Sequence, residues 1–202
     1  MFKEKSPIYP VLFILILTVI LTTILAFLDQ VTEPVIAFNQ ELELKEKILN
    51  VFDLYDENMD DEEINRFFDE HVTKEDYKDE VLYILEENGE TMAYAVPFEG
   101  PGLWGSIKGY LGLSGDLQEI TGVEFIKQDE TPGLGGRISE APYKEQYRGL
   151  SVESPEDGAI VINKPAPGGN IDAIAGATQT STFVTNMINE DVTAFIEERK
   201  GE

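Results

Sequence analysis

Cysteine is absent from this 202-residue chain, and histidine occurs only once. Without cysteine there can be no cysteine-ligated iron–sulfur cluster, no CxxCH haem attachment, no thiol catalysis and no disulfide. Any redox chemistry would therefore have to be carried by an organic cofactor. The single histidine, His71, stands alone, and a lone histidine is far more often an ordinary surface residue than a ligand. We assign no metal ligand and no catalytic residue.

Positive charge is also scarce. Against 39 aspartates and glutamates there are 15 lysines and arginines, which gives a net charge of −24. A surface this acidic repels nucleic acid and the anionic inner leaflet of a membrane, so we expect neither as a partner. Hydrophobic residues make up 42% of the chain, which is enough for a folded domain with a core.

One long hydrophobic run, Ile8–Leu28, lies near the N-terminus and contains no charged residue. A helix needs about 20 such residues to cross a bilayer. Lys3 and Lys5 precede the run, and it is followed by Asp29, Glu33 and Glu41. The positive-inside rule then places residues 1–7 in the cytoplasm and all that follows the run outside it, in a single-pass protein of the inner (plasma) membrane. The lipid bilayer is thus a predicted partner.

A cleaved signal peptide is the alternative for this run. The apolar region of a signal peptide is usually about 7–15 residues long and is followed by small residues at the cleavage site. Here the run is longer, and Ala26-Phe27-Leu28 lacks the small-x-small pattern. We therefore favour a retained anchor.

Downstream, apolar periodicity and turn residues outline an α+β domain. Asn88-Gly89 lies between two apolar runs and is a strong signal for a two-residue hairpin. Helices, then hairpins, then an amphipathic terminal helix favour a largely antiparallel sheet flanked by helices. We expect a helical membrane-proximal region over residues 29–78 and the main domain over residues 79–202. The expected helices are Thr32–Tyr55, Met59–Val72 and Thr182–Arg199, and the expected strands are Val81–Leu85, Thr91–Phe98, Ser106–Leu113, Ile120–Lys127 and Ala159–Asn163.

Small and hydroxyl-bearing residues crowd the segment from Asp172 to Ser181, just before the terminal helix. Ala175-Gly176-Ala177 would let another group approach the backbone closely. Thr178, Thr180 and Ser181 gather near the helix start, where serine and threonine are ordinary N-caps. A helix start is also a ready-made anion site, with free N–H groups and a favourable dipole. The residues alone leave both interpretations open.

Two glycine-rich segments further upstream could contact a flat ligand. Glu130-Thr131-Pro132-Gly133-Leu134-Gly135-Gly136 combines a stiff Pro-Gly turn, an apolar leucine and a Gly-Gly backbone that can pass close to a ring. Gly100-Pro101-Gly102-Leu103-Trp104-Gly105 holds the only tryptophan. Taken singly, the first segment is most simply a tight connection after a predicted strand. The tryptophan of the second is, by itself, most simply a residue that packs in a core or at its edge.

Taken together, these motifs resemble those of a known family. Asp-x-x-small-Gly-Ala-Thr-x-Thr-Ser near the C-terminus, Glu-Thr-Pro-Gly-Leu-Gly upstream and an N-terminal anchor are similar to the FMN-binding domain family, over most of the chain from about Leu28 onward. Its members include an FMN-bearing subunit of the sodium-translocating NADH:quinone reductase and its counterpart in the Rnf electron-transport complex. The resemblance implies one FMN, joined through its phosphate to the threonine of Gly-Ala-Thr, which is Thr178.

The resemblance also implies which residues surround that cofactor. A threonine hydroxyl needs activation, and no histidine or cysteine lies near Thr178 in the sequence, so a separate flavin transferase is the expected partner for attachment. The loop over Glu130–Gly136 should lie against the flavin ring, with Trp104 close by. The implied cofactor-binding residues are Thr178, Gly176, Ala177, Asp172, Thr180, Ser181, Glu130, Thr131, Pro132, Gly133, Leu134, Gly135, Leu103 and Trp104.

The function implied is that of an electron-transfer subunit in a membrane redox-driven ion pump, alongside other membrane subunits and with no activity of its own. The motifs match best with the quinone-reductase member at Gly102-Leu103-Trp104, at Gly135-Gly136 and over residues 141–149. Tyr143 and Tyr147 stand where the family often has tryptophan. The chain length is closer to that of the Rnf member, so an Rnf-type ferredoxin:NAD electron-transport complex is the alternative. A membrane-tethered binding or sensor module without flavin, and a stand-alone flavinylated reductase, are further alternatives.

Overall fold

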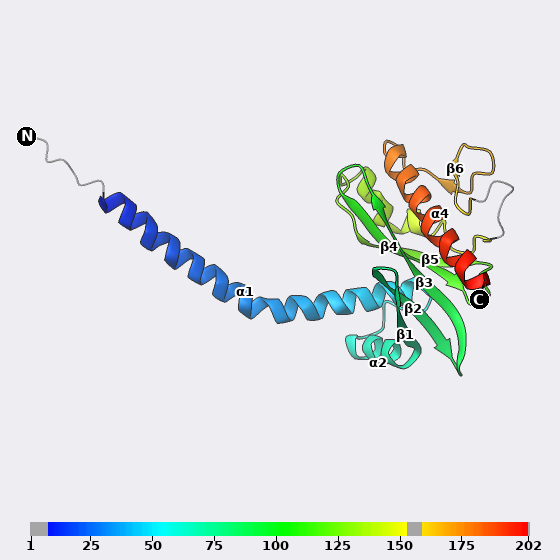
Figure 1. Ribbon diagram of the computed structural model, residues 1–202, viewed down its shortest axis with the longest axis horizontal. Helices are drawn as coiled ribbons and strands as arrows, with labels where there is room; N and C mark the ends of the chain where they lie inside the picture. The colour runs from blue at the N-terminus through cyan, green and yellow to red at the C-terminus, as the bar shows by residue number, and fades with distance from the viewer. Residues whose placement is uncertain (1–7, 153–158, 202) are drawn as a thin grey trace, which may run out of the picture. The chain divides into compact units, whose positions relative to one another are not determined.

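The computed structural model describes residues 8–152 and 159–201 (Figure 1). The chain divides into two compact units, Met1–Glu43 and Leu44–Glu202. Residues 1–7, which include Lys3 and Lys5 and which we expect on the cytoplasmic side of a membrane, lie outside the described residues.

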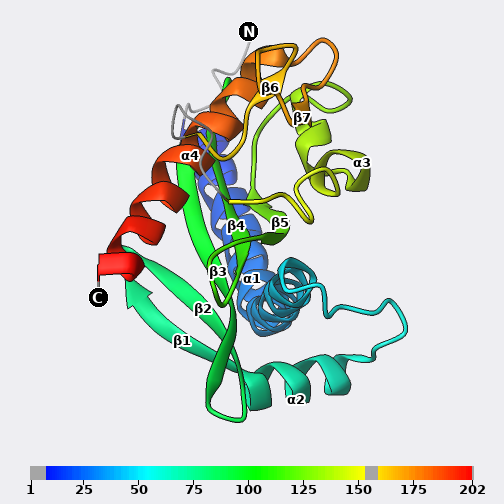
Figure 2. The ribbon, with the colours of Figure 1, turned by 90° about the vertical axis from the view of Figure 1, so that its right-hand side faces the viewer.

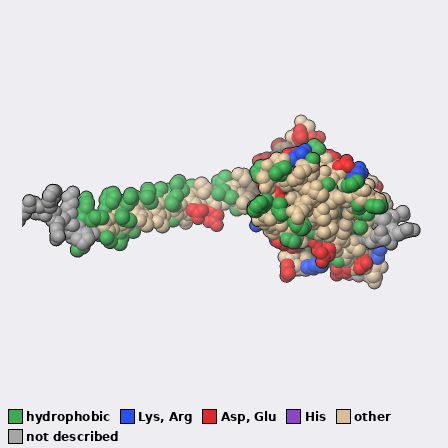
Figure 3. Space-filling view, turned by 90° about the horizontal axis from the view of Figure 1, so that it is seen from above, with side chains coloured by type: hydrophobic (Ala, Val, Ile, Leu, Met, Phe, Trp, Pro, Cys, Tyr) green, Lys and Arg blue, Asp and Glu red, His purple; other side chains and the backbone are tan. Residues whose placement is uncertain are grey.

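The first helix, α1, runs without interruption from Ile8 to Val51. Two separate helices were expected here, but the segment between them contains no glycine, and Pro34 is accommodated inside the helix although it lacks an N–H group. Between Ile8 and Phe38 the large apolar side chains are exposed (Figure 3). By length and composition, α1 could cross a membrane.

The expected helix to Tyr55 ends earlier, at Val51, because the backbone turns at Asp53. Asp53 has φ +62°, and the N–H of Leu54 donates to the carbonyl of Leu49 at 2.9 Å. A left-handed residue followed by such a bond is the usual way for a helix to stop. The second helix, α2 (Asp61–His71), agrees with the sequence prediction and begins with a capping box between Asp60 and Glu63.

Five antiparallel strands form the main sheet in the order β1-β2-β3-β4-β5 (Figure 2). The α+β class and the antiparallel sheet agree with the sequence prediction. Asn88 and Gly89 both have positive φ and connect β2 to β3 as expected. The strands are β1 (Val72–Tyr77), β2 (Glu80–Glu87), β3 (Glu90–Pro101), β4 (Ser106–Ser114) and β5 (Ile120–Lys127).

Strand β1 occupies the end of the region 29–78 that was expected to be helical. Its four central residues are exposed and polar, so it carries no period-two apolar signal, and only its ends, Val72 and Tyr77, are buried. It pairs with β2 alone, at the edge of the sheet. Charged side chains are common on edge strands because they discourage pairing with other chains.

The sheet is packed on both faces. Alternation along each strand sends Leu82, Val96 and Leu111 into the main core, which α4 (Thr178–Gly201) covers. Their neighbours Tyr83 and Tyr110 contact each other on the opposite face, where Tyr83 also meets Phe68 of α2. The buried side chains from the end of α1 belong to this second layer and are Ile48, Leu49 and Val51.

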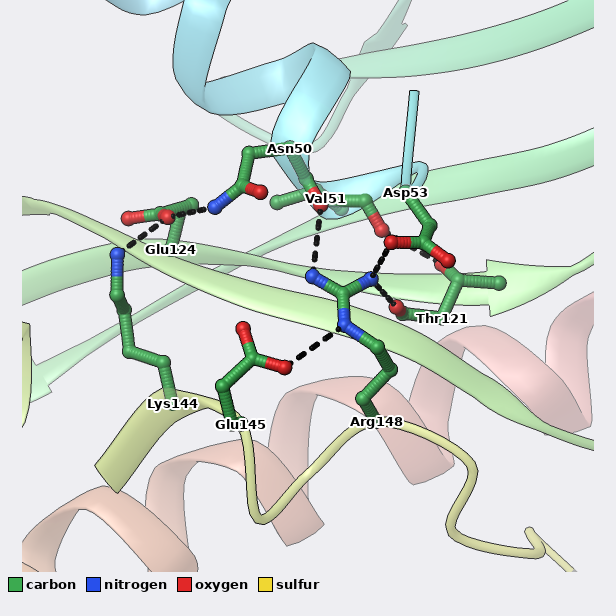
Figure 4. Close-up of polar contacts among 8 residues, drawn as sticks. All are labelled: Asn50, Val51, Asp53, Thr121, Glu124, Lys144, Glu145 and Arg148. Carbon is green, nitrogen blue, oxygen red and sulfur yellow. Dashed lines mark hydrogen bonds and ion pairs between the residues drawn. The ribbon is translucent and has the colours of Figure 1, made fainter. Parts of the chain in front are cut away.

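The last turn of α1 is fixed to β5 and to α3 (Ala141–Lys144) by buried polar groups (Figure 4). Glu124 of β5 is 4% exposed, and one of its carboxylate oxygens accepts from both the Asn50 amide and the Lys144 ammonium. A buried carboxylate is tolerated when a cation and further hydrogen bonds compensate for its lost hydration. We call Asn50, Glu124 and Lys144 the helix-end cluster.

The carbonyl groups at the end of α1 are also satisfied from the sheet side. Arg148 donates to the carbonyls of Thr121 and Asn50, and the Thr121 hydroxyl donates to the carbonyl of Val51 at 2.7 Å (Figure 4). These carbonyls lie over the paired glycines Gly112 and Gly122, where a Cβ would come within 3 Å of the Val51 oxygen. Glycine is therefore required for the helix end to approach the sheet this closely.

The remaining elements are short. The expected strand Ala159–Asn163 is wrong: β6 is Asn163–Lys164, and it pairs in parallel with β7 (Ile171–Asp172). The backbones of Ile160 and Val161 instead bond to the side-chain amide of Asn189 on α4, which both accepts and donates there. A side-chain amide thus replaces the ladder that a strand would have needed.

Candidate functional site

Three segments that are far apart in the sequence meet around one cleft of about 460 Å³. They are the loop between β3 and β4, the loop that follows β5, and the beginning of α4. The residues that line the cleft are Leu103, Trp104, Glu130, Thr131, Leu134, Gly135, Gly176, Ala177, Thr178, Gln179 and Thr180. The two glycine-rich segments and the hydroxyl-rich segment singled out in the sequence are thus brought together.

Helix α4 begins at Thr178, four residues before the expected start. The first bond of the helix runs from the N–H of Ser181 to the carbonyl of Ala177 at 3.1 Å. In the part of the chain that the structure describes, the N–H groups of residues 178–180 have no hydrogen-bond partner. Ala177 has no side chain that could cap them, so three donors and the positive end of the helix dipole remain available at the cleft.

The side chains on this first turn have different environments. Thr178 is exposed and faces the cleft, and Gln179, which the motif gave no reason to choose, lines the cleft beside it. Ser181 is fully buried: its hydroxyl accepts from the N–H of Ile174 and donates to the carbonyl of Ala177. Ser181 does not line the cleft, and its role is to fold the preceding turn.

The turn before α4 and the loop after β5 contact each other at Gly176. Gly176 has φ +80°, a conformation that side-chain-bearing residues rarely adopt. A Cβ at this position would also come within 3.1 Å of the Leu134 side chain. Gly133 has φ +74° and, with Pro132, forms the turn that presents Leu134, although neither of these two residues lines the cleft.

Glu130 lies at the base of the cleft and is 6% exposed. One carboxylate oxygen accepts from the N–H groups of Leu103 and Trp104, at 2.6 and 3.2 Å. The other accepts from the hydroxyl of Thr180, at 2.7 Å. Thr180 is itself buried, so it faces this carboxylate and not the solvent.

The rim of the cleft is apolar and exposed. Trp104 is 71% exposed, Leu103 48% and Leu134 45%. Among the described residues of the unit Leu44–Glu202, only two other large hydrophobic side chains are exposed, Met92 at 47% and Leu54 at 39%. Exposed apolar groups that cluster in one concave place, with a few polar groups converging on it, are typical of a ligand site.

The model of the FMN-binding domain family matches residues 102–193, which include all three segments of the cleft. The chain contains an FMN-binding domain. It is homologous to the NqrC proteins of Na(+)-translocating NADH-quinone reductase: 33% identical over 116 residues to the one from Pseudomonas aeruginosa, and 32% identical over 111 residues to the one from Pasteurella multocida. These alignments cover 54% and 53% of this chain but 44% and 43% of the relatives, so the match spans less than half the length of each relative.

Solved structures have the same fold. The structure of Shewanella oneidensis NqrC superimposes with a TM-score of 0.64, over 79% of this chain and 97% of the other, at 19% identity. That of the corresponding Na(+)-translocating NADH-quinone reductase protein from Parabacteroides distasonis gives 0.62, over 79% and 92%, at 21% identity. Because the sequence identities are only 19% and 21%, these structural similarities establish the fold alone.

Asp172, a further predicted site residue, also lies outside the cleft. It lines a second cavity of about 410 Å³ on the other side of the turn over residues 173–177. Its carboxylate is exposed and pairs with Lys164 at 3.2 Å, and its N–H donates to the side chain of Gln146. Tyr143 lines the same cavity, and burial raises the pKa of its phenol above the ordinary value. The geometry therefore gives Asp172 a role in holding the turn.

The cleft has the features that FMN requires. Its volume falls within the usual range for small-molecule sites, roughly 300–1,000 Å³. One end offers the free N–H groups at the start of α4, which suit a phosphate, and the rim offers three apolar side chains for a flat ring. No lysine or arginine is among the described residues that line it, so the charge of the phosphate would be stabilised by neutral donors, such as the backbone N–H groups and the side chain of Gln179.

Proposed function

We propose that this domain carries one FMN, joined through its phosphate to the Thr178 hydroxyl. The observation that carries the proposal is the cleft itself, where Thr178 lies beside the N–H groups at the start of α4 and three exposed apolar side chains. FMN, when bound, supplies reversible one- and two-electron transfer. The residues of the chain hold the phosphate, cover the ring and exclude water from part of it.

Each part of the cleft has a task in this proposal. The N–H groups of residues 178–180 and the helix dipole stabilise the negative charge that a phosphodiester keeps. Leu103, Trp104 and Leu134 cover the apolar ring, and their high exposure supports this because it would be removed on binding. The described residues that line the cleft include no histidine, cysteine or lysine that could activate Thr178, which supports attachment by a separate flavin transferase.

We further propose that the chain is an electron-transfer subunit of a membrane NADH:quinone reductase that pumps sodium ions, with other membrane subunits as partners. The names of the relatives favour this complex over the Rnf type. The exposed apolar length of α1 supports a membrane anchor, because so much apolar surface is unfavourable in water. Lys3, Lys5 and the acidic residues after Leu28 support a cytoplasmic N-terminus and a flavin domain outside the cytoplasm.

Attachment is tested by producing the full chain together with a flavin transferase and measuring its intact mass and its fluorescence after denaturation. The parent protein should gain the mass of one FMN less one water, and Thr178→Val should gain nothing. The matched control is Thr182→Val, which removes an exposed hydroxyl one turn further along α4. It should be fully loaded.

Thr178→Val should leave the fold intact, because exposed substitutions of this kind change the free energy of unfolding by about 0.5 kcal/mol or less. Flavin fluorescence that survives denaturation in the Thr178→Val protein would contradict Thr178 as the attachment site. A parent protein that gains no mass in the presence of the transferase would contradict covalent attachment altogether, and would leave a tethered binding module as the alternative.

A further inference from the structure

The buried carboxylate of Glu130 connects three segments that have few other polar contacts. It joins the loop after β5, to which it belongs, to the backbone of Leu103 and Trp104 and to the first turn of α4 through Thr180. Within the described ranges 8–152 and 159–201, these are the only hydrogen bonds of Leu103 and Trp104. The turn itself is closed by the N–H of Gly102, which donates to the carbonyl of Gly105 at 2.7 Å, and Glu130 fixes the two residues between them.

The space around the carboxylate is closely packed. A Cβ at Gly102 would come within 2.5 Å of one oxygen of Glu130, and a Cβ at Gly135 within 2.5 Å of the other. The carboxylate thus fills a pocket bordered by two glycines, where no larger residue fits without rearrangement. Its position is set by this packing as well as by its hydrogen bonds.

The chemistry of the donors explains why a carboxylate occupies this position. Two backbone N–H groups can only donate, so the oxygen facing them must accept both hydrogen bonds. The second oxygen accepts from a buried hydroxyl, and an acceptor on both sides is what an ionised carboxylate offers. A glutamine would keep one carbonyl oxygen for the N–H groups, but its NH₂ group can only donate, so the hydroxyl of Thr180 would have to turn and accept. An aspartate is one methylene group shorter and would not reach both sides.

We propose that Glu130 is a positioning residue, which holds Trp104 at the rim of the cleft so that its indole covers the bound ring. This inference rests on the proposed function for its role toward FMN. The exposed Trp104 side chain has no hydrogen bond of its own among the described residues, so its placement follows from its backbone, which Glu130 fixes.

Trp104 is the only tryptophan of the chain, so its fluorescence reports on this loop without a label. The first measurement uses the flavin-free Thr178→Val protein, full length in detergent micelles. Replacing Glu130 by alanine in that protein should lower the fluorescence anisotropy of Trp104, because the loop loses its hydrogen bonds and its local motion increases. Glu130→Gln keeps the shape of the side chain and one of its two acceptor oxygens, so it should lower the anisotropy of Trp104 by an intermediate amount.

The control is Asp129→Asn, which removes one negative charge from the neighbouring exposed residue and breaks none of the three hydrogen bonds. Its anisotropy should equal that of the parent. Equal anisotropy in the parent, Glu130→Ala and Glu130→Gln proteins would overturn the inference, as would an Asp129→Asn loss as large as that of Glu130→Ala. If Glu130→Ala fails to fold, as judged by circular dichroism, Glu130→Gln and Thr180→Val decide the question, since each removes part of the network.

The second measurement uses the flavin-loaded protein and separates a positioning role from a merely structural one. Glu130→Ala should keep the covalent flavin, as measured by intact mass, but should shift the midpoint potential and weaken the quenching of Trp104 by the flavin, and Glu130→Gln should partly restore both. An unchanged potential and unchanged quenching would overturn the role toward FMN. If even the parent acquires no flavin, the proposed function fails, while the flavin-free measurement still decides whether Glu130 holds the loop.

Discussion

Glu124 and Glu130 are two buried glutamates that lie close together in the sequence, one within β5 and one just after it, with exposures of 4% and 6%. Glu124 is compensated by an ammonium group, that of Lys144, and joins the end of α1 to the sheet. Among the residues that the structure describes, Glu130 is compensated by neutral donors alone, two backbone N–H groups and a hydroxyl. The two glutamates therefore have different structural roles. In the helix-end cluster the polar side chains bond to one another, whereas the cleft around Glu130 retains free N–H groups and exposed apolar side chains that a ligand could contact.

The largest effect on stability should come from breaking the ion pair of the helix-end cluster. Lys144→Met keeps the shape of the side chain but leaves Glu124 buried without its cation, which should reduce the free energy of unfolding by about 3 kcal/mol. Thermal unfolding of the full chain in detergent measures this. Lys127→Met, at an exposed position of the same strand as Glu124, is the control and should change it by about 0.5 kcal/mol or less. The anisotropy of Trp104 should not change, and a change would contradict the independence of the two regions.

A smaller effect is expected from a methyl group placed beside Glu130. Gly135→Ala would bring a Cβ within 2.5 Å of Glu130 and 2.7 Å of Thr180, so it should destabilise the protein by about 1–3 kcal/mol and lower the anisotropy of Trp104. Gly136→Ala is the matched control, because its nearest neighbour, the Thr131 carbonyl, lies at 3.3 Å. Equal effects of the two substitutions on stability and anisotropy would show that the space around Glu130 is not critical.

The smallest effect should come from Arg148→Lys. Arg148 donates to the carbonyls of Thr121 and Asn50 at once, and a lysine ammonium cannot span both, so about 1 kcal/mol of stability should be lost. The loss should depend little on salt, because the carboxylates that pair with Arg148 are largely exposed and such pairs contribute little. Arg137→Lys, in an exposed pair with Glu140, is the control and should be nearly neutral in the same unfolding measurement.

The fold could be predicted where the sequence signal is local. The apolar run of α1, the hairpin at Asn88-Gly89 and the acidic start of α2 were all found from spacing and residue type. Strand β1 could not be found, because an edge strand with exposed polar residues has no apolar period. The strand predicted from Ala159 does not form, because the backbone there bonds to the side chain of Asn189. Asn189 lies 28 or 29 positions away, so no local sequence pattern could reveal this partner.

The sequence was enough to predict which segments form the site. It was not enough to predict which residues of those segments face the cleft and which hold the turn. Thr178, Leu134 and Trp104 were selected from the motifs, and the structure brings them to one cleft. Ser181 and Asp172 belong to the same motif but point elsewhere, one into the core and one toward a second cavity. Residues that are adjacent on a helix or a turn necessarily point in different directions, so a motif contains both those that face a ligand and those that hold the turn.

By itself, the sequence determined the long apolar segment near the N-terminus, the exclusion of cysteine-based chemistry and the three segments that carry glycine, hydroxyl and aromatic residues. Only the tertiary structure decided that one carboxylate, Glu130, holds the tryptophan loop against the first turn of α4, and that another, Glu124, holds the end of α1. The physical reason is that periodicity and turn chemistry act over a few residues, whereas a buried carboxylate is stabilised by donors that reach it from 20 to 74 positions away.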